Sequence, residues 1–124
     1  MKRIIASEAA PAAIGPYSQA IAANGFVYTS GQLGIIPESG ELANGLANQT
    51  VQALENLTNV LKAAGLTLDS VVKTTCYLKS MDDFSLFNEI YAQYFVNNKP
   101  ARSCFAVAQL PKGGLVEIEA VASL

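Results

Sequence analysis

Apolar residues between positions 48 and 64 recur at steps of three and four, the spacing of one face of an α-helix. The residues that form this stripe are Val51, Leu54, Leu57, Leu61 and Ala64. Gly65 follows directly and suits the left-handed conformation that ends many helices. The pattern predicts an amphipathic helix over residues 48–64 with one buried face.

A second helical stripe is rich in aromatic residues and runs to about Val96. Ser80 precedes it, with a carboxylate three residues later at Asp83, which is a common pattern at a helix start. Pro100 follows two asparagines and a lysine and stops the helix. The predicted buried residues of this helix are Phe84, Phe87, Ile90, Tyr91, Tyr94 and Phe95.

Short runs of apolar and β-branched residues between turn residues predict the strands. Asn24-Gly25 separates two of these runs and is the dipeptide that a type I′ β-hairpin favours. Pro111 and Gly113-Gly114 separate the last two runs. The predicted strands are residues 4–6, 17–22, 26–30, 72–78 and the two runs between residues 100 and 122.

These elements follow one another as β-β-β-α-β-α-β-β. The two strand–helix–strand units predict parallel strand pairs joined by right-handed crossovers, and the first hairpin adds antiparallel strands. A mixed six-stranded sheet with both helices on one face follows, which is a two-layer α+β sandwich. At 124 residues we expect one domain, residues 1–124. No helix remains to cover the other sheet face, so we expect self-association.

The composition narrows the possible functions. Apolar residues make up 51% of the chain and the net charge is −2, which gives no support to a nucleic-acid-binding groove. We expect a cytoplasmic protein with reduced thiols, because both cysteines lie in apolar strands and no signal peptide or membrane-spanning run is evident. Histidine is absent, which excludes Ser-His-Asp and Cys-His catalysis and histidine-based zinc sites.

Three charged residues interrupt the apolar strands near the C-terminus. Arg102 begins one strand, and a guanidinium there is suited to binding a carboxylate through two parallel hydrogen bonds. Glu117 and Glu119 are two positions apart in the other strand and therefore share a face. A carboxyl group in a partly dry cleft has a raised pKa and can hold or activate water. An ion pair between Arg102 and either glutamate is the structural alternative.

The distance between these charges limits what they can do together. In a simple hairpin of the last two strands, Arg102 would pair near residue 122, about 15 Å from Glu117. One small substrate could not contact both side chains in that arrangement. A shared site therefore requires a different strand order or a second subunit.

Other residues give weaker indications of function. Cys104 shares a strand face with Arg102, but no imidazole is available to deprotonate it, so a buried wall residue is the better interpretation. Tyr17 lies at a loop–strand junction, and Ser30-Gly31 leaves backbone N–H groups at a strand end. Asn88 lies on the polar side of the second helix. A packing or turn role is the default interpretation of each.

Several segments in one order resemble the RidA/YjgF family of reactive-intermediate deaminases, over essentially the whole chain. They are residues 13–20 (AIGPYSQA), 29–32 (TSGQ), 72–75 (VKTT), 100–103 (PARS), 110–112 (LPK) and 116–120 (VEIEA). The resemblance implies a chorismate-mutase-like sandwich that forms a homotrimer with a central barrel and sites between subunits. It also implies hydrolysis of 2-enamine and 2-imine acids, such as 2-aminoacrylate and 2-aminocrotonate, to 2-keto acids and ammonia, without a metal or cofactor.

Motif by motif, the resemblance assigns catalytic roles to two residues. Arg102 would bind the substrate carboxylate, and Glu117 would position or polarise the attacking water. Imines already hydrolyse in water, so positioning and charge stabilisation suffice for catalysis. The residues that the resemblance places around the substrate are Tyr17, Ser30, Gly31, Asn88 and Cys104.

Two other functions are compatible with parts of the sequence. A trimer that binds 2-keto acids without turnover, as a regulatory protein, would use the same Arg102. RNA cleavage or translational inhibition, reported for relatives, agrees poorly with an acidic chain that lacks histidine. Turnover of an enamine distinguishes the enzyme from the regulatory protein.

Overall fold

The C-terminal strand lies in the middle of the sheet. In the computed structural model, which describes residues 1–124, β7 (Val116–Ser123) pairs antiparallel with β3 (Phe26–Thr29) and with β5 (Val71–Leu78). The order across the sheet is β1-β2-β3-β7-β5-β6, and the short β4 also pairs with β7. The other strands are β1 (Arg3–Ile5), β2 (Ala20–Ala23), β4 (Gln32–Leu33) and β6 (Ala101–Ala106).

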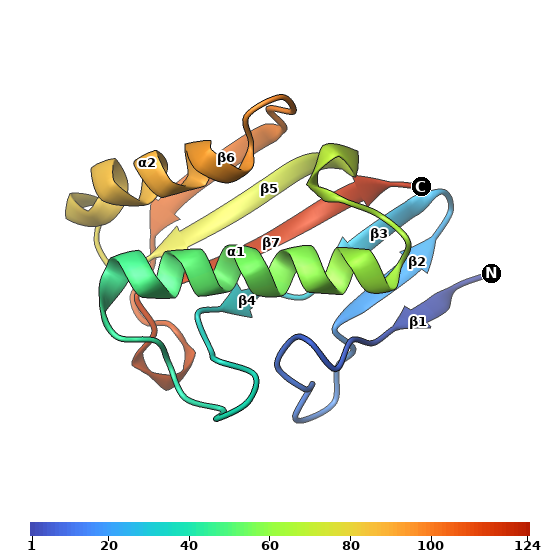
Figure 1. Cartoon of the computed structure of the whole chain (residues 1–124), viewed down its shortest axis with the longest axis horizontal. Helices are drawn as coiled ribbons and strands as arrows, with labels where there is room; N and C mark the ends of the chain where they lie inside the picture. Colours follow the sequence, from blue (N-terminus) through green and yellow to red (C-terminus); the bar gives the residue numbers. More distant parts are fainter.

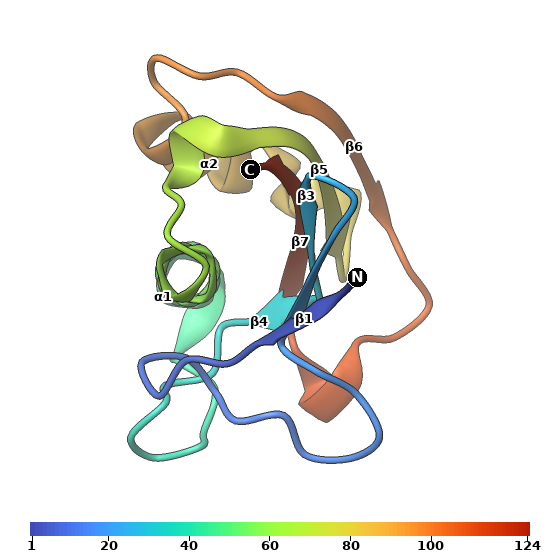
Figure 2. The same cartoon turned by 90° about the vertical axis from the view of Figure 1, so that its right-hand side faces the viewer.

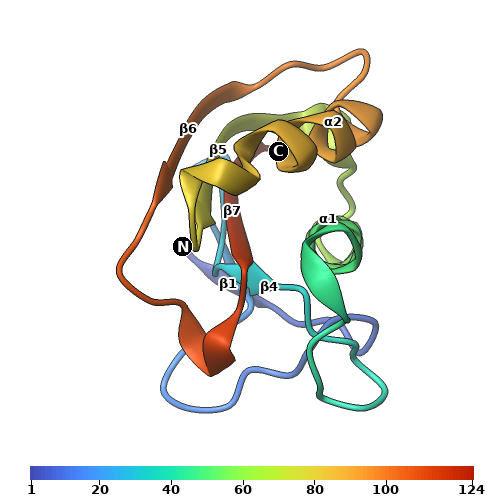
Figure 3. The ribbon, with the colours of Figure 1, turned by 90° about the vertical axis from the view of Figure 1, so that its left-hand side faces the viewer.

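Both helices cover the same face of this sheet, which confirms the predicted two-layer α+β sandwich (Figure 1, Figure 2 and Figure 3). Helix α1 (Gly45–Ala63) crosses the sheet over β7 and β4, and α2 (Phe84–Tyr94) packs beside it. A 3₁₀ turn, Met81–Asp83, leads into α2, and the Ser80 hydroxyl caps this turn by accepting from the N–H of Asp82.

The core lies between α1 and the alternate residues of the central strands that face it. Val116, Ile118 and Ala122 of β7 are fully buried, as are Leu54 and Leu57 of α1. Each fully buried leucine or isoleucine contributes about 2 kcal/mol relative to an exposed one. The sheet and α1 are therefore held together mainly by apolar contacts along β7.

The strand pairing confirms one predicted parallel pair and contradicts the other. β5 and β6 are parallel neighbours, with Thr74 beside Arg102. β3 and β5 share a direction, but β7 lies between them and bonds antiparallel to both. Antiparallel pairing is slightly more stable per residue than the parallel pairing that was predicted for β3 and β5. β5 also separates β6 from β7, so the last two strands form no hairpin.

The helix boundaries and the first hairpin agree closely with the sequence pattern. Helix α1 begins three residues before the predicted start at Asn48, and α2 ends at Tyr94 rather than near Val96. Gly65 has a φ of +79° and its N–H donates to the carbonyl of Lys62, as a helix-ending glycine does. Asn24 and Gly25 both have positive φ, 53° and 83°, as a type I′ turn requires.

Two strand predictions need correction. The run predicted as residues 17–22 becomes strand only at Ala20, because a turn at Gly15 keeps the preceding residues out of the sheet. In that turn the N–H of Tyr17 donates to the carbonyl of Gly15 at 2.9 Å. The second correction is β4, a seventh strand that was not predicted because glycines flank its two residues.

The sheet face away from the helices carries both polar and apolar side chains. Tyr28 and Phe105 are 47% and 46% exposed there, and the Tyr77 ring packs edge-on against Phe105 at 5.4 Å. Lys73 Nζ donates to Ser103 Oγ at 3.0 Å on the same face. These half-exposed side chains agree with the expectation of self-association. The helices are all too short or too polar to cross a membrane.

Candidate functional site

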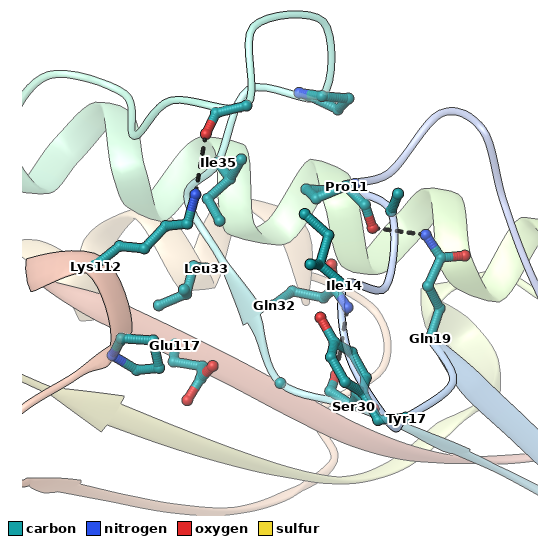
Figure 4. Close-up of a pocket in the computed structure, with 15 residues that line it drawn as sticks. Pro11, Ile14, Tyr17, Gln19, Ser30, Gln32, Leu33, Ile35, Lys112 and Glu117 are labelled. Atoms are coloured by element: carbon teal, nitrogen blue, oxygen red, sulfur yellow. Dashed lines mark hydrogen bonds between the residues drawn. The ribbon is translucent and has the colours of Figure 1, made fainter.

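A cavity of about 660 Å³ lies where the N-terminal loop, β4 and the start of β7 meet (Figure 4). Four predicted site residues line it, namely Tyr17, Ser30, Gly31 and Glu117. Figure 4 shows Tyr17 and Ile14 from the N-terminal loop on one side and Glu117 from β7 on the other. The fold therefore brings this subset of the predicted residues to one place.

Gln19 and Ser30 hold the N-terminal loop against the cavity. Gln19 is 5% exposed, and its Nε2 donates to the carbonyl of Pro11 at 2.7 Å and to that of Ser7 at 3.1 Å. Ser30 Oγ donates to the carbonyl of Ser18 at 2.6 Å. The hydroxyl hydrogen of Ser30 is thus already bonded to the backbone, and this bond positions the segment that carries Tyr17.

Strand β4 forms the opposite wall of the cavity, and helix α1 holds this strand in place. Asn56 is fully buried, and its Nδ2 donates to the carbonyls of Leu33 at 3.1 Å and Ile35 at 2.8 Å. A Cβ on Gly34 would lie 2.5 Å from Cα of Gln49, so only glycine allows β4 to approach α1 this closely. The wall is therefore rigid, because buried hydrogen bonds and backbone contact both hold it.

Glu117 lies half-buried against Gly31. A Cβ on Gly31 would lie 2.7 Å from Cδ of Glu117, so a larger residue there would displace the carboxyl group. Burial raises the pKa of Glu117, and the negative charge of Glu119 on the same strand face raises it further. Tyr77 donates its hydroxyl hydrogen to Oε1 of Glu119 at 3.1 Å, which keeps Glu119 in place. This environment suits a carboxyl group that takes up and releases a proton.

The remaining predicted residues form a separate cluster between β6 and α2. Arg102 Nη1 donates to Oδ1 of Asn88 at 2.7 Å, and the guanidinium carbon lies 4.7 Å from the ring centroid of Tyr91. Cys104 follows on the same face, beside Cys76, and both thiols are free. Burial raises the pKa of the Cys104 thiol and Arg102 offsets this only in part, so the site does not favour a nucleophilic thiolate.

The two clusters lie apart within one chain. Arg102 pairs with Thr74, whereas Glu117 pairs with Tyr77, three residues farther along β5 and on its other side. Strand spacing places their Cα atoms about 14 Å apart. Arg102 also faces α2, whereas Glu117 faces away from the helices. The strand order therefore does not bring both side chains to one small molecule, and an ion pair between them in one chain is ruled out.

Comparison with known proteins identifies the family. The family model described as Endoribonuclease L-PSP matches residues 7–124. The chain belongs to this Endoribonuclease L-PSP family. A solved Yersinia pestis protein of the conserved Rid protein family, YyfA, is 48% identical, with a TM-score of 0.98 over the full length of both chains. The RidA/YjgF resemblance of the sequence motifs is thereby confirmed.

Two further Endoribonuclease L-PSP relatives are similar over nearly their whole length. Human 2-iminobutanoate/2-iminopropanoate deaminase is 51% identical over 98% of this chain and 90% of its own. Escherichia coli TdcF, solved with bound serine, is 39% identical with a TM-score of 0.95, and the match covers 98% of both chains. The family likeness therefore includes every element that forms the two clusters.

The sequence motifs did not indicate a functional role for some of the residues at these two clusters. Lys112 lines the cavity, with a positive φ of 58°, and its Nζ donates to the carbonyl of Gly40 at 3.4 Å. Its LPK segment was part of the resemblance, but its place beside the cavity depends on a loop distant in sequence. Gln19 and Asn56 are buried polar residues, and polar residues among apolar neighbours are the sequence feature that could have found them.

Proposed function

We propose that this protein hydrolyses 2-enamine and 2-imine acids to 2-keto acids and ammonia, through a single domain that spans residues 1–124. The observation that carries the proposal is the 51% identity, over 98% of this chain, with a human enzyme named 2-iminobutanoate/2-iminopropanoate deaminase. Arg102 and Glu117 supply a carboxylate-binding group and a proton acceptor, which this reaction needs.

The separation of the two clusters supports a homotrimer whose sites lie between subunits. One subunit would supply Glu117, Tyr17 and Gly31 around the cavity, and its neighbour would supply Arg102 with Cys104. Each chain then contributes different residues to two sites, which is a heterologous contact, and three such contacts would close the ring of a trimer. The half-exposed sheet face, with Tyr28 and Phe105, provides surface for this contact.

The reaction follows from these positions. Arg102 holds the substrate carboxylate, so that the imine carbon of the substrate lies over the Glu117 carboxylate. Glu117 accepts a proton from water as the water oxygen bonds to that carbon and the C=N electron pair moves to nitrogen. The nitrogen takes up this proton from Glu117 and then a second one, which Glu117 carries from the new hydroxyl group, and the C–N bond breaks so that ammonia leaves as the C=O bond of the 2-keto acid forms. Tyr17 and Ile14 line the cavity opposite Glu117 and would limit the escape of the imine.

The charge of Glu119 should set the pH range of this reaction. A neighbouring negative charge disfavours ionised Glu117, so the Glu119→Gln variant should have a lower Glu117 pKa. Activity that needs the ionised form is lost as pH falls through this pKa, so the acid limb of kcat/KM against pH should move to lower pH. The same profile of Asp69→Asn, which removes an exposed carboxylate near the start of β5, should match wild type. An acid limb that stays in place in Glu119→Gln would contradict the coupling.

A coupled assay tests the function directly. A threonine or serine dehydratase generates the enamine, and semicarbazide traps imine that escapes hydrolysis. Adding the protein should raise the fraction released as 2-keto acid, in proportion to its concentration. If the protein binds 2-oxobutanoate but leaves this fraction unchanged, regulatory binding replaces the enzyme. Cleavage of a single-stranded RNA that persists at moderate salt, without imine turnover, would instead favour the ribonuclease.

A further inference from the structure

We propose that Tyr91 is a positioning residue for Arg102, and that it fixes the guanidinium so that its unused N–H groups face the substrate carboxylate. This inference rests on the proposed function, because it concerns how the substrate of that reaction is bound. In this proposal Tyr91 does not contact the substrate itself and acts only through Arg102.

One face of α2 contacts the guanidinium from several directions. The guanidinium carbon lies 4.7 Å from the Tyr91 ring centroid and 5.5 Å from that of Phe84. Asn88 accepts a hydrogen bond from Nη1 at 2.7 Å. These three residues are spaced by four and three positions, so they follow one another along a single helix face. Arg102 is therefore held against α2 rather than extended into solvent.

Tyr91 is in turn fixed by the sheet and by its neighbours in the helix. Its hydroxyl shares a 2.7 Å hydrogen bond with the Thr74 hydroxyl, and Thr74 is the residue that pairs with Arg102 across β5 and β6. The Tyr91 ring is 7% exposed and lies 5.6 Å from the Phe87 ring and 4.6 Å from the Phe95 ring. The hydrogen bond and the two neighbouring rings restrain the Tyr91 ring, so it defines where the guanidinium rests.

This arrangement leaves Arg102 prepared for a carboxylate. Aromatic rings contact the face of a guanidinium, whereas carboxylates bind its N–H edge. Asn88 engages Nη1, and other N–H groups of the planar fork stay available. A long side chain that is already ordered loses less freedom when the ligand binds. The ring of Tyr91 should therefore affect substrate binding more than the chemical step.

The test compares two truncations of neighbouring aromatic residues. Tyr91→Leu removes the ring beneath Arg102, and Tyr94→Leu removes a partly exposed ring of the same helix whose hydroxyl donates to Glu55. We expect Tyr91→Leu to weaken binding of 2-oxobutanoate about ten-fold in calorimetry and to raise KM more than it lowers kcat. Tyr91→Phe, which keeps the ring, should bind within about three-fold of wild type. Tyr94→Leu loses the hydrogen bond to Glu55, so it should lose thermal stability without this loss of binding.

A second comparison shows whether Tyr91 acts through Arg102. In an Arg102→Ala background, Tyr91→Leu should have no further effect on the Kd for 2-oxobutanoate. The inference is overturned if Tyr91→Leu and Tyr94→Leu weaken binding equally, or if Tyr91→Leu still weakens binding without Arg102. If Tyr91→Leu does not fold, Phe84→Leu removes the other ring and carries the same expectations. If Arg102→Ala alone binds as wild type does, it is the proposed carboxylate site that fails instead.

Discussion

Replacing Arg102 with alanine should lower kcat/KM for 2-imino acids by about 100-fold, because the substrate carboxylate loses its charged partner in a partly desolvated site. The fold should survive, since Arg102 lies on an edge strand. The one residue that hydrogen-bonds to its side chain, Asn88, can bond to water instead. The measurement is the dehydratase-coupled release of 2-keto acid, with the uncatalysed rate subtracted.

Two matched variants make the Arg102 result specific. Arg3→Ala removes the same type of side chain from the opposite edge strand, β1, and should leave kcat/KM unchanged. Arg102→Lys keeps the charge but not the planar fork, and its activity should fall between wild type and Arg102→Ala. Equal activity of Arg102→Ala and Arg3→Ala would remove Arg102 from the catalytic site.

Mixing two inactive variants should restore activity if each site forms between subunits. Arg102→Ala lacks one half of the site and Glu117→Gln lacks the other, so neither forms a complete site alone. In trimers reassembled at random from equal amounts, about a quarter of the sites would combine an intact Arg102 with an intact Glu117. Activity should therefore rise from near the background rate to about a quarter of wild type.

The double variant Arg102→Ala, Glu117→Gln is the control for this mixture. It supplies neither Arg102 nor Glu117, so mixing it with either single variant should restore no activity. Native mass spectrometry establishes that subunits have exchanged before activity is measured. Mixed trimers of the two single variants that remain inactive would contradict a site shared between subunits.

The sequence predicted the elements that depend on neighbouring residues. The stripe from Val51 to Leu61 predicted α1, and Asn24-Gly25 predicted the β2–β3 hairpin; the structure confirms both. It did not predict that β7 lies between β3 and β5. That arrangement depends on pairs such as Tyr28 with Val121, which lie far apart along the chain and leave no local pattern.

The candidate site was predictable to a similar extent. Strand alternation correctly placed Glu117 with Glu119, and Cys104 with Arg102, on shared faces. It could not show that these two faces are opposite sides of the sheet, because that depends on which alternate residues turn toward the helices. Tyr91 was expected only as part of a buried stripe. Its contact with Arg102 arises because α2 lies beside β6, which no single segment reveals.

The place of β7 also has a consequence for synthesis. This strand comes last in the chain, yet it joins β3 and β4 to β5 and supplies much of the surface on which α1 packs. A nascent chain that has emerged only as far as β6 has two sheet fragments without the strand between them, and α1 has an exposed apolar face. The core can close only when residues 116–123 have left the ribosome. Until then, those uncovered edges are the part of the molecule most in need of a chaperone.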